Sequence, residues 1–181
     1  GGFKGGYPYE VEFDWEHMAK KGIVVVAIAY RLGVLGFLAH PLLSAEAPEE
    51  PKGNYGTMDQ LAALKWVKRN IAAFGGDPDR ITIAGQSAGA MSVQNLMTSP
   101  MAEGLIDGAI IESSVTVAFA EKADRSHPLD KAEQAGALFF EKAGIKSLEE
   151  ARKLPGEELV RLEDELLGPG VHFEPVIDDI I

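Results

Sequence analysis

A serine between two glycines is the residue of this chain that is best suited to chemistry. The segment Gly85-Gln86-Ser87-Ala88-Gly89 has the Gly-x-Ser-x-Gly pattern of a nucleophile elbow, a sharp turn from a strand into a helix. Because such a turn is strained and crowded, we expect Gly85 and Gly89 to be glycines so that no side chain collides there. The Ser87 hydroxyl would stand near a helix N-terminus, which stabilises developing negative charge. The pattern predicts Ser87 as a nucleophile.

The residues around the motif predict the elements that such a turn needs. A short apolar run at 81–84 predicts the preceding strand, and residues 88–97 predict the following helix. Further strands are predicted at 107–111 and at 23–30, where nearly every residue is apolar and many are β-branched, as in a parallel strand covered on both faces. Strands that alternate with helices are typical of a doubly wound, mostly parallel sheet with flanking helices, so we predict an α/β fold.

A long amphipathic helix is predicted between the strands at 23–30 and 81–84. Thr57 and Gln60 have the Thr-x-x-Gln spacing of a capping box at its start, and Gly75 predicts its end. The apolar residues at helical spacing on its buried face are Leu61, Leu64, Val67, Ile71 and Phe74.

The composition changes after the third predicted strand. Residues 130–167 are rich in Glu, Lys, Ala and Leu and predict helices that start near Ser147 and Pro155, with 157–165 as a solvated face. Since the chain begins without Met and ends in apolar residues, we expect a fragment. The predicted organisation is a single incomplete domain over 1–181, with a sheet core and elbow at 1–113, a helical insertion at 114–172, and the start of a following, extended segment at 173–181.

The composition argues against several classes of protein. With 17 Lys and Arg against 28 Asp and Glu, the formal net charge is −11, which disfavours nucleic acid or an anionic membrane as a partner. There is no cysteine, which excludes disulfides and thiolate metal sites, and no apolar run approaches the roughly 18 residues of a membrane span. No histidine pair has metal-ligand spacing, so we predict neither a metal nor a cofactor.

Several blocks of sequence together resemble the type B carboxylesterases, the cholinesterase-like branch of the α/β-hydrolases. Besides the elbow at 85–90, they are Gly-Gly-Phe at 1–3, Tyr-Arg-Leu-Gly-Val-Leu-Gly-Phe-Leu at 30–38, Gly-Asn-Tyr-Gly-Thr-Met-Asp-Gln at 53–60, Trp-Val at 66–67, Asn-Ile-Ala-Ala-Phe-Gly-Gly-Asp-Pro at 70–78 and Phe-Glu-Pro-Val-Ile-Asp at 173–178. The resemblance implies an α/β-hydrolase fold, present only in part, and hydrolysis of a small carboxylic ester through an acyl-serine.

The resemblance also implies roles for individual residues. Ser87 matches the family's nucleophile, and Ala88 matches the residue whose backbone N–H joins the oxyanion hole. Gly1 and Gly2 match the glycine loop that supplies the other oxyanion donors. The family's acid and histidine correspond to positions beyond Ile181, so we expect the fragment to be inactive alone. The acyl and alcohol groups, the oligomeric state and the localisation stay open, although the family is compatible with an extracytoplasmic or secreted protein.

Two other interpretations are retained. His172 follows Ser87 and could pair with Asp124 or Asp130 in a minimal hydrolase. The remaining histidines, for which we expect structural or solvated roles, are His17, His40 and His127. Alternatively, the chain could belong to a non-catalytic binding module, since cholinesterase-like folds also serve in recognition.

Overall fold

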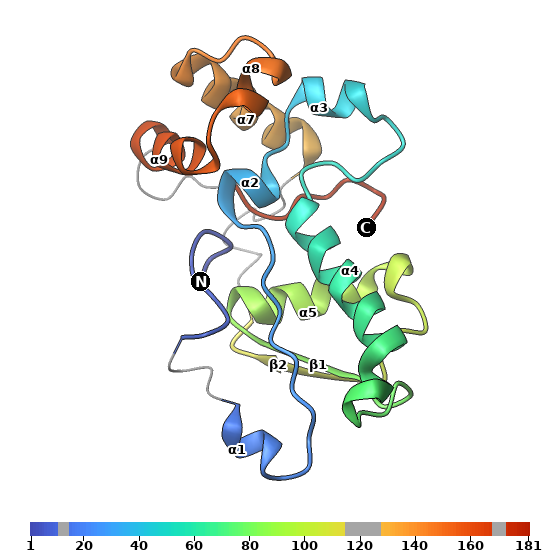
Figure 1. Ribbon diagram of the computed structural model, residues 1–181. Helices are drawn as coiled ribbons and strands as arrows, with labels where there is room; N and C mark the ends of the chain where they lie inside the picture. Colours follow the sequence, from blue (N-terminus) through green and yellow to red (C-terminus); the bar gives the residue numbers. More distant parts are fainter. Residues whose placement is uncertain (11–14, 115–127, 168–172) are drawn as a thin grey trace. The chain divides into compact units, whose positions relative to one another are not determined.

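The computed structural model describes residues 1–10, 15–114, 128–167 and 173–181 of the chain (Figure 1). The strands are β1 (Thr82–Gln86) and β2 (Gly108–Glu112), and short 3₁₀ turns lie at η2 (Ile71–Phe74) and η3 (Pro100–Ala102). The α-helices are α1 (Glu16–Ala19), α2 (Gly33–Phe37), α3 (Pro41–Glu46), α4 (Tyr55–Asn70), α5 (Ala88–Thr98), α7 (Leu129–Ala143), α8 (Leu148–Lys153) and α9 (Gly156–Leu167). None of these helices is long and apolar enough to cross a membrane.

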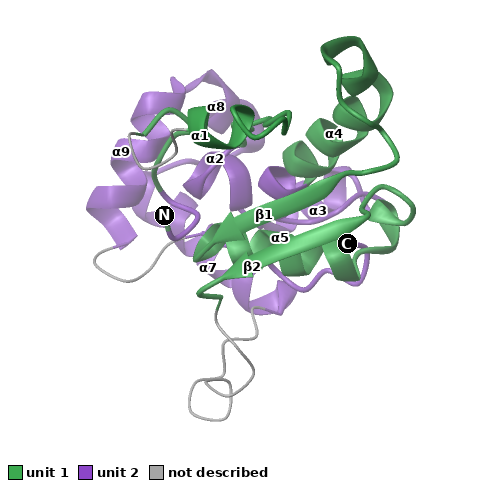
Figure 2. Ribbon diagram, turned by 90° about the horizontal axis from the view of Figure 1, so that it is seen from below, with its two compact units in different colours: residues 1, 5–30, 58–115 green, residues 2–4, 31–57, 116–181 purple. Residues whose placement is uncertain are grey.

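The chain divides into two compact units, which Figure 2 shows in different colours. Unit 1 comprises residues 1, 5–30 and 58–115, and unit 2 comprises residues 2–4, 31–57 and 116–181. The predicted organisation into 1–113, 114–172 and 173–181 stays a prediction.

Unit 1 contains the parallel sheet and the helix that follows its first strand. β1 and β2 pair in register from Thr82 opposite Gly108 to Gln86 opposite Glu112, and α5 packs on both strands. The predicted strands at 81–84 and 107–111 and the helix at 88–97 are therefore confirmed within one or two residues. The buried core of this unit is formed by Leu61, Leu96 and Ala102, against which Met58, Ile83, Met101, Leu105 and Ile106 pack.

The predicted strand at 23–30 is wrong as a hydrogen-bonded element. The described sheet consists of β1 and β2, and residues 23–30 make no ladder with either strand. Val24 and Val26 are 43% and 42% exposed, so this run is not covered on both faces within the described residues. A strand is stabilised by pairing with a neighbour, and apolar β-branched composition alone does not supply that neighbour.

The amphipathic helix is confirmed, but its ends differ from the prediction. α4 begins at Tyr55, so Thr57 lies inside the helix and is buried, and no capping box forms. η2 continues the helix to Phe74, and Gly75 ends it with a left-handed φ of 82°. The predicted apolar face is right for Leu61, Leu64 and Ile71, which are buried, but Phe74 is 63% exposed because it lies in the turn rather than on the buried face.

Unit 2 is built from helices around a cluster of aromatic rings. α7 contacts α3 and α9, and α9 contacts α2. The Phe3 and Phe37 rings meet edge to face at 5.3 Å, and those of Phe139 and Phe173 at 5.7 Å. The helix starts predicted near 147 and 155 are confirmed, and the Ser147 hydroxyl accepts the Glu150 N–H at the N-terminus of α8.

Buried polar side chains in unit 2 bind backbone groups that are far away in sequence. The Asn54 amide exchanges two hydrogen bonds with the backbone of Val176, at 2.9 and 3.0 Å. The Asp178 carboxylate accepts the Lys52 N–H at 2.9 Å. These contacts hold residues 52–54 against the extended segment at 173–178 without a sheet.

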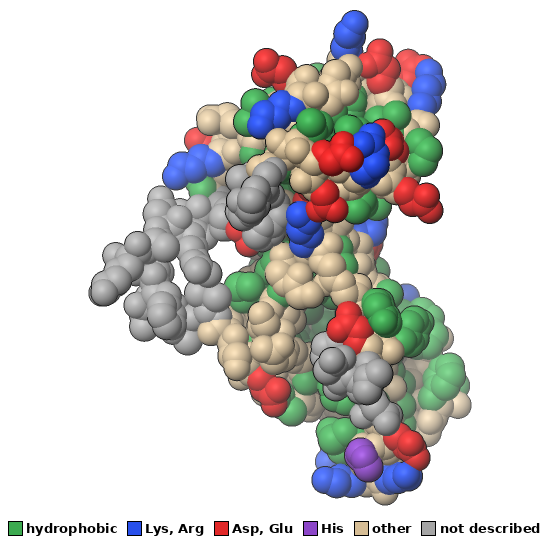
Figure 3. Space-filling model, turned by 90° about the vertical axis from the view of Figure 1, so that its left-hand side faces the viewer, with side chains coloured by type: hydrophobic (Ala, Val, Ile, Leu, Met, Phe, Trp, Pro, Cys, Tyr) green, Lys and Arg blue, Asp and Glu red, His purple; other side chains and the backbone are tan. Residues whose placement is uncertain are grey.

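The acidic stretch 157–165 is not uniformly solvated, which corrects the prediction. Arg161 does form exposed ion pairs with Glu158 and Glu165 on α9, both at 2.5 Å. Figure 3 shows acidic and basic side chains interspersed in this way in the upper part of the face that it presents. Glu163, by contrast, is only 2% exposed, and its carboxylate accepts the Val34 N–H at 2.8 Å and the Phe173 N–H at 3.5 Å.

Candidate active site

Ser87 lies in the turn between β1 and α5, as the motif predicts. Its backbone has φ 55° and ψ −120°, a conformation that a residue with a side chain rarely adopts. The Ser87 N–H donates to the Glu112 carbonyl at 2.9 Å, which extends the pairing of β1 with β2. The Ser87 carbonyl accepts the Met91 N–H at 3.0 Å, which begins the helix. The same residue therefore ends the strand and starts the helix.

The side chain of Ser87 is exposed, whereas the next residue is buried. Ser87 occupies the N-cap position of α5, but its hydroxyl makes no capping hydrogen bond to the helix. Ala88 is 3% exposed and begins the first turn, where backbone N–H groups lack partners within the helix. The hydroxyl of Ser87 and the N–H of Ala88 are thus adjacent groups at the positive end of the helix.

The two glycines of the motif have different steric surroundings. A Cβ on Gly85 would lie 2.2 Å from the Gly89 carbonyl oxygen and 2.3 Å from the Gly89 carbonyl carbon, so a side chain at 85 would push the turn open. A Cβ on Gly89 would meet no described atom within 4 Å. The predicted steric need therefore holds for Gly85 and is wrong for Gly89, because at position 89 it is the backbone that makes the close approach.

Gly1 and Gly2 begin a tight turn at the start of the described chain. The Gly1 ammonium donates to the Gly5 carbonyl at 2.5 Å, and the Gly5 N–H donates to the Gly1 carbonyl at 3.3 Å. Gly2 has φ 65°. Gly1 belongs to unit 1 with Ser87, and Gly2 belongs to unit 2, so the oxyanion role of both glycines stays a prediction.

The histidines within the described ranges do not have the environment of a general base. His17 is exposed on α1. His40 is 6% exposed, its Nδ1 accepts the Leu42 N–H at 3.0 Å, and its ring lies 4.2 Å from that of Phe140. Burial lowers the pKa of His40, and the Glu133 carboxylate opposes the decrease. His40 thus caps α3 as a neutral ring, in accord with the expected structural role.

The alternative triad falls mostly on residues that are not described. His172, His127 and Asp124 lie outside the described ranges, and Asp130 lies in the first turn of α7. Among the residues that are described, no cluster of three His, Asp or Glu side chains could hold a metal ion.

A buried polar cluster next to the elbow was missed from the sequence. Gln60 Nε2 donates to Ser92 Oγ at 2.9 Å, and Ser92 Oγ donates to the Ala88 carbonyl at 3.1 Å. Burial raises the pKa of the neighbouring Tyr30 hydroxyl, and the polar side chains of Ser92 and Gln60 oppose the increase. The sequence signal is the polar Ser92, four residues after Ala88 among the small and apolar residues at 88–93, together with Gln60, for which the sequence predicts a capping box instead.

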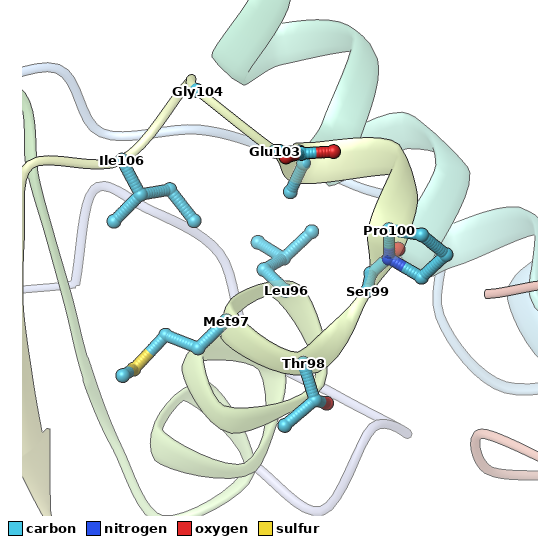
Figure 4. A pocket seen from close by; sticks show the side chains of 9 residues that line it. Leu96, Met97, Thr98, Ser99, Pro100, Glu103, Gly104 and Ile106 are labelled. Atoms are coloured by element: carbon cyan, nitrogen blue, oxygen red, sulfur yellow. The ribbon is translucent and has the colours of Figure 1, made fainter.

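Among the described residues of unit 1, two open hollows lie at the surface, and Ser87 does not line either of them. One, of about 400 Å³, is formed by the end of α5 and the following turn, where Leu96, Met97 and Ile106 gather (Figure 4). The other, of about 320 Å³, is lined by residues 24–27 together with Trp66, Ile71 and Phe74.

The strand, the strained serine turn and the helix define the chain as part of an α/β-hydrolase. Solved structures support this class. A PNB esterase structure is similar with a TM-score of 0.84 at 36% identity, over 99% of this chain and 38% of that one. A carboxylesterase structure from Geobacillus stearothermophilus is similar with a TM-score of 0.83 at 40% identity, over 98% of this chain and 36% of that one.

The chain belongs to the carboxylesterase family, whose model matches residues 1–181. The para-nitrobenzyl esterase of Bacillus subtilis (strain 168) is 39% identical over 169 residues, which are 92% of this chain and 32% of that protein. The fumonisin B1 esterase of Sphingopyxis macrogoltabida is 52% identical over 113 residues, 62% of this chain and 21% of that protein. The chain thus spans about a third or less of the length of these relatives.

Proposed function

We propose that the protein hydrolyses carboxylic esters of small molecules through an acyl-enzyme intermediate on Ser87. The observation that carries this proposal is the backbone of Ser87, held at φ 55° between β1 and α5 with an exposed side chain. Strain of this kind persists only where the surrounding structure enforces it, and it is concentrated at functional sites.

In the proposed reaction, Ser87 Oγ attacks the ester carbonyl carbon while a histidine accepts the hydroxyl proton. The negative oxygen that forms receives hydrogen bonds from the Ala88 N–H and from the glycine loop that includes Gly1 and Gly2. The C–O bond to the alcohol breaks, and the histidine returns the proton to the leaving alcohol. Water then attacks the acyl-serine and releases the carboxylic acid. No metal or cofactor takes part in these steps.

We further propose that the histidine and its orienting acid lie beyond residue 181, so that the 181-residue chain has little or no activity. The described histidines support this assignment, because His17 is exposed on α1 and His40 is committed to the cap of α3. The esterase names of the similar proteins support the substrate class.

The test uses the full-length protein that contains this chain, a fluorophosphonate probe and a p-nitrophenyl ester. We expect the probe to label Ser87, as located by mass spectrometry, and Ser87→Ala to abolish both labelling and hydrolysis. A full-length protein that binds neither reagent covalently would be a binding module instead. Robust turnover by residues 1–181 alone, lost in His172→Ala, would support the minimal hydrolase.

A further inference from the structure

A polar cluster includes residues from three segments of unit 1 next to the elbow, and its two hydrogen-bonded members, Gln60 and Ser92, are buried. We call Tyr30, Gln60 and Ser92 the Tyr30–Gln60–Ser92 cluster. Tyr30 ends the extended run at 23–30, Gln60 lies on α4, and Ser92 lies one turn into α5. Gln60 and Ser92 are 3% and 6% exposed, so water does not compete freely for their hydrogen bonds.

The donor and acceptor roles in the hydrogen bonds of Ser92 are fixed by its partners. Its single hydroxyl proton goes to the Ala88 carbonyl at 3.1 Å, and its oxygen accepts from Gln60 Nε2 at 2.9 Å. The chain of donors therefore starts on α4 and ends on the residue that directly follows Ser87. These two hydrogen bonds connect the first turn of α5 to α4, in addition to the apolar packing between them.

The cluster is not the arrangement that stability alone would favour. Gln60 Oε1 is buried and has no hydrogen-bond partner among the described residues. A buried acceptor without a partner destabilises the fold, and an apolar side chain of similar volume avoids that cost. A positioning role for the Gln60 Nε2, which donates to Ser92 Oγ, would account for a glutamine at this position.

That role follows from the strain at the elbow. Ser87 would relax toward ordinary backbone angles if the first turn of α5 could shift, and such a shift would also move the Ala88 N–H. We propose that Gln60 and Ser92 are positioning residues, which hold Ala88 in place and thereby keep the Ser87 hydroxyl and the Ala88 N–H in their reactive geometry. This inference rests on the proposed function of Ser87.

The experiment compares Gln60→Met and Ser92→Ala with a matched control in the full-length protein. Thr98→Val is the control, because Thr98 Oγ1 makes the same kind of hydrogen bond, to the Gln94 carbonyl at 3.0 Å, at the exposed far end of α5. The measured quantities are kcat and KM for a p-nitrophenyl ester, Ki for a trifluoromethyl ketone that forms a tetrahedral adduct on the serine, and the midpoint of urea unfolding.

We expect kcat to fall about tenfold or more in Gln60→Met and Ser92→Ala, because small displacements of reacting groups are costly. KM should stay nearly constant, and Ki for the ketone should rise by the same factor by which kcat/KM falls, since the ketone depends on the same geometry as the transition state. The urea midpoint of Gln60→Met should not decrease. The kcat of the double variant should fall no further than that of the more impaired single variant, because both residues act through the same two hydrogen bonds. Thr98→Val should match the unaltered protein.

The outcomes separate this inference from the proposed function. Full activity in Ser87→Ala refutes the nucleophile and, with it, the inference. Loss of activity in Ser87→Ala, with kcat in Gln60→Met and Ser92→Ala as high as in Thr98→Val, refutes the positioning role only. If Ser92→Ala fails to fold, Gln60→Met decides the question. A fall in its kcat that is matched by a fall in its urea midpoint assigns Gln60 a merely structural role and overturns the inference.

Discussion

The elbow region of unit 1 and the buried carboxylates of unit 2 differ in whether their buried polar groups have hydrogen-bond partners. Around the elbow, unit 1 holds a strained serine and a buried amide oxygen without a described partner. In unit 2 the buried carboxylates of Glu163 and Asp178 each accept backbone N–H groups. The elbow region of unit 1 thus contains features that reduce stability, whereas these two buried carboxylates of unit 2 have hydrogen-bond partners.

We interpret this difference as a separation between residues that serve the proposed reaction, at the elbow, and residues that stabilise the fold, at the buried contacts of unit 2. Strained backbone and buried polar atoms without partners are concentrated at functional sites. We therefore expect substitutions at the elbow to change activity more than stability, and substitutions at the buried contacts of unit 2 to change stability more than activity. The following experiments, from the largest expected effect to the smallest, test that expectation in the full-length protein.

The largest effect is expected for Gly85→Ala. The added Cβ would lie 2.2 Å from the Gly89 carbonyl oxygen, so the turn that carries Ser87 must open. We expect ester hydrolysis to fall by at least about 100-fold, in line with the sensitivity of catalysis to shifts of about 1 Å. The measurement is kcat, corrected for the fraction of fluorophosphonate-reactive protein.

Gly89→Ala is the matched control for this variant. Its Cβ meets no described atom within 4 Å, and alanine is the better helix former by up to about 1 kcal/mol. The thermal unfolding midpoint should stay the same or rise, and activity should be largely retained. Equal loss of activity in both variants would show that the second glycine of the motif is needed for a reason other than the steric surroundings described here.

The next largest effect is expected for Glu163→Leu in unit 2. The substitution leaves the buried N–H groups of Val34 and Phe173 without their acceptor, which should cost about 2–3 kcal/mol. Hydrogen exchange at the Val34 amide should accelerate accordingly, whereas Glu163→Gln, which keeps one carbonyl oxygen as acceptor, should lose less. Unchanged hydrogen exchange at the Val34 amide, combined with a fall in kcat, would contradict the expectation that this buried contact affects stability more than activity.

A smaller, pH-dependent effect is expected at His40. Burial lowers its pKa in the folded protein below the ordinary value of 6.5, so the folded state favours the neutral ring. The stabilisation is complete above pH 6.5 and is lost as the pH falls from there toward the lowered pKa, since the unfolded state then binds the proton more readily. His40→Asn, which keeps an acceptor for the Leu42 N–H, should flatten the curve of unfolding free energy against pH in this range. An identical curve would assign the acid sensitivity to other groups.

The smallest effect is expected for Arg161→Ala on α9. The carboxylates of Glu158 and Glu165 raise the pKa of Arg161, but all three side chains are substantially exposed. Water and salt screen such pairs, so the unfolding midpoint should not change measurably at either low or high salt. A clear loss of stability at low salt alone would show that the exposed ion pairs of Arg161 do stabilise the protein.

The local parts of the fold and site could be predicted from the sequence, and the distant contacts could not. The elbow, β1 and α5 follow from a short motif and its flanking apolar runs, because a sharp turn of this kind is encoded within a few residues. The hydrogen bond from Gln60 to Ser92 joins residues 32 positions apart, and that from Val34 to Glu163 joins residues 129 apart. Since the periodicity of a helix identifies its polar positions but not their partners, the sequence predicts a cap for Gln60 and a solvated position for Glu163.

The run at 23–30 and Phe74 show a second limit of sequence reasoning. Their apolar composition correctly indicated residues that can be buried, but burial also requires a surface to pack against. Phe74 is 63% exposed and Val24 is 43% exposed, and both line the same open hollow. Composition thus identifies which side chains favour burial, whereas the available neighbours determine whether they are buried.

The left-handed backbone at residue 87 has a consequence for protein engineering. Glycine adopts a φ of 55° without a steric penalty, whereas a side chain in such a conformation costs about 1–3 kcal/mol. Replacing this serine with glycine should therefore give a protein that is inert toward esters yet more resistant to heat. A screen that selects for thermal tolerance alone would favour that exchange and would discard the hydroxyl on which the proposed catalysis depends.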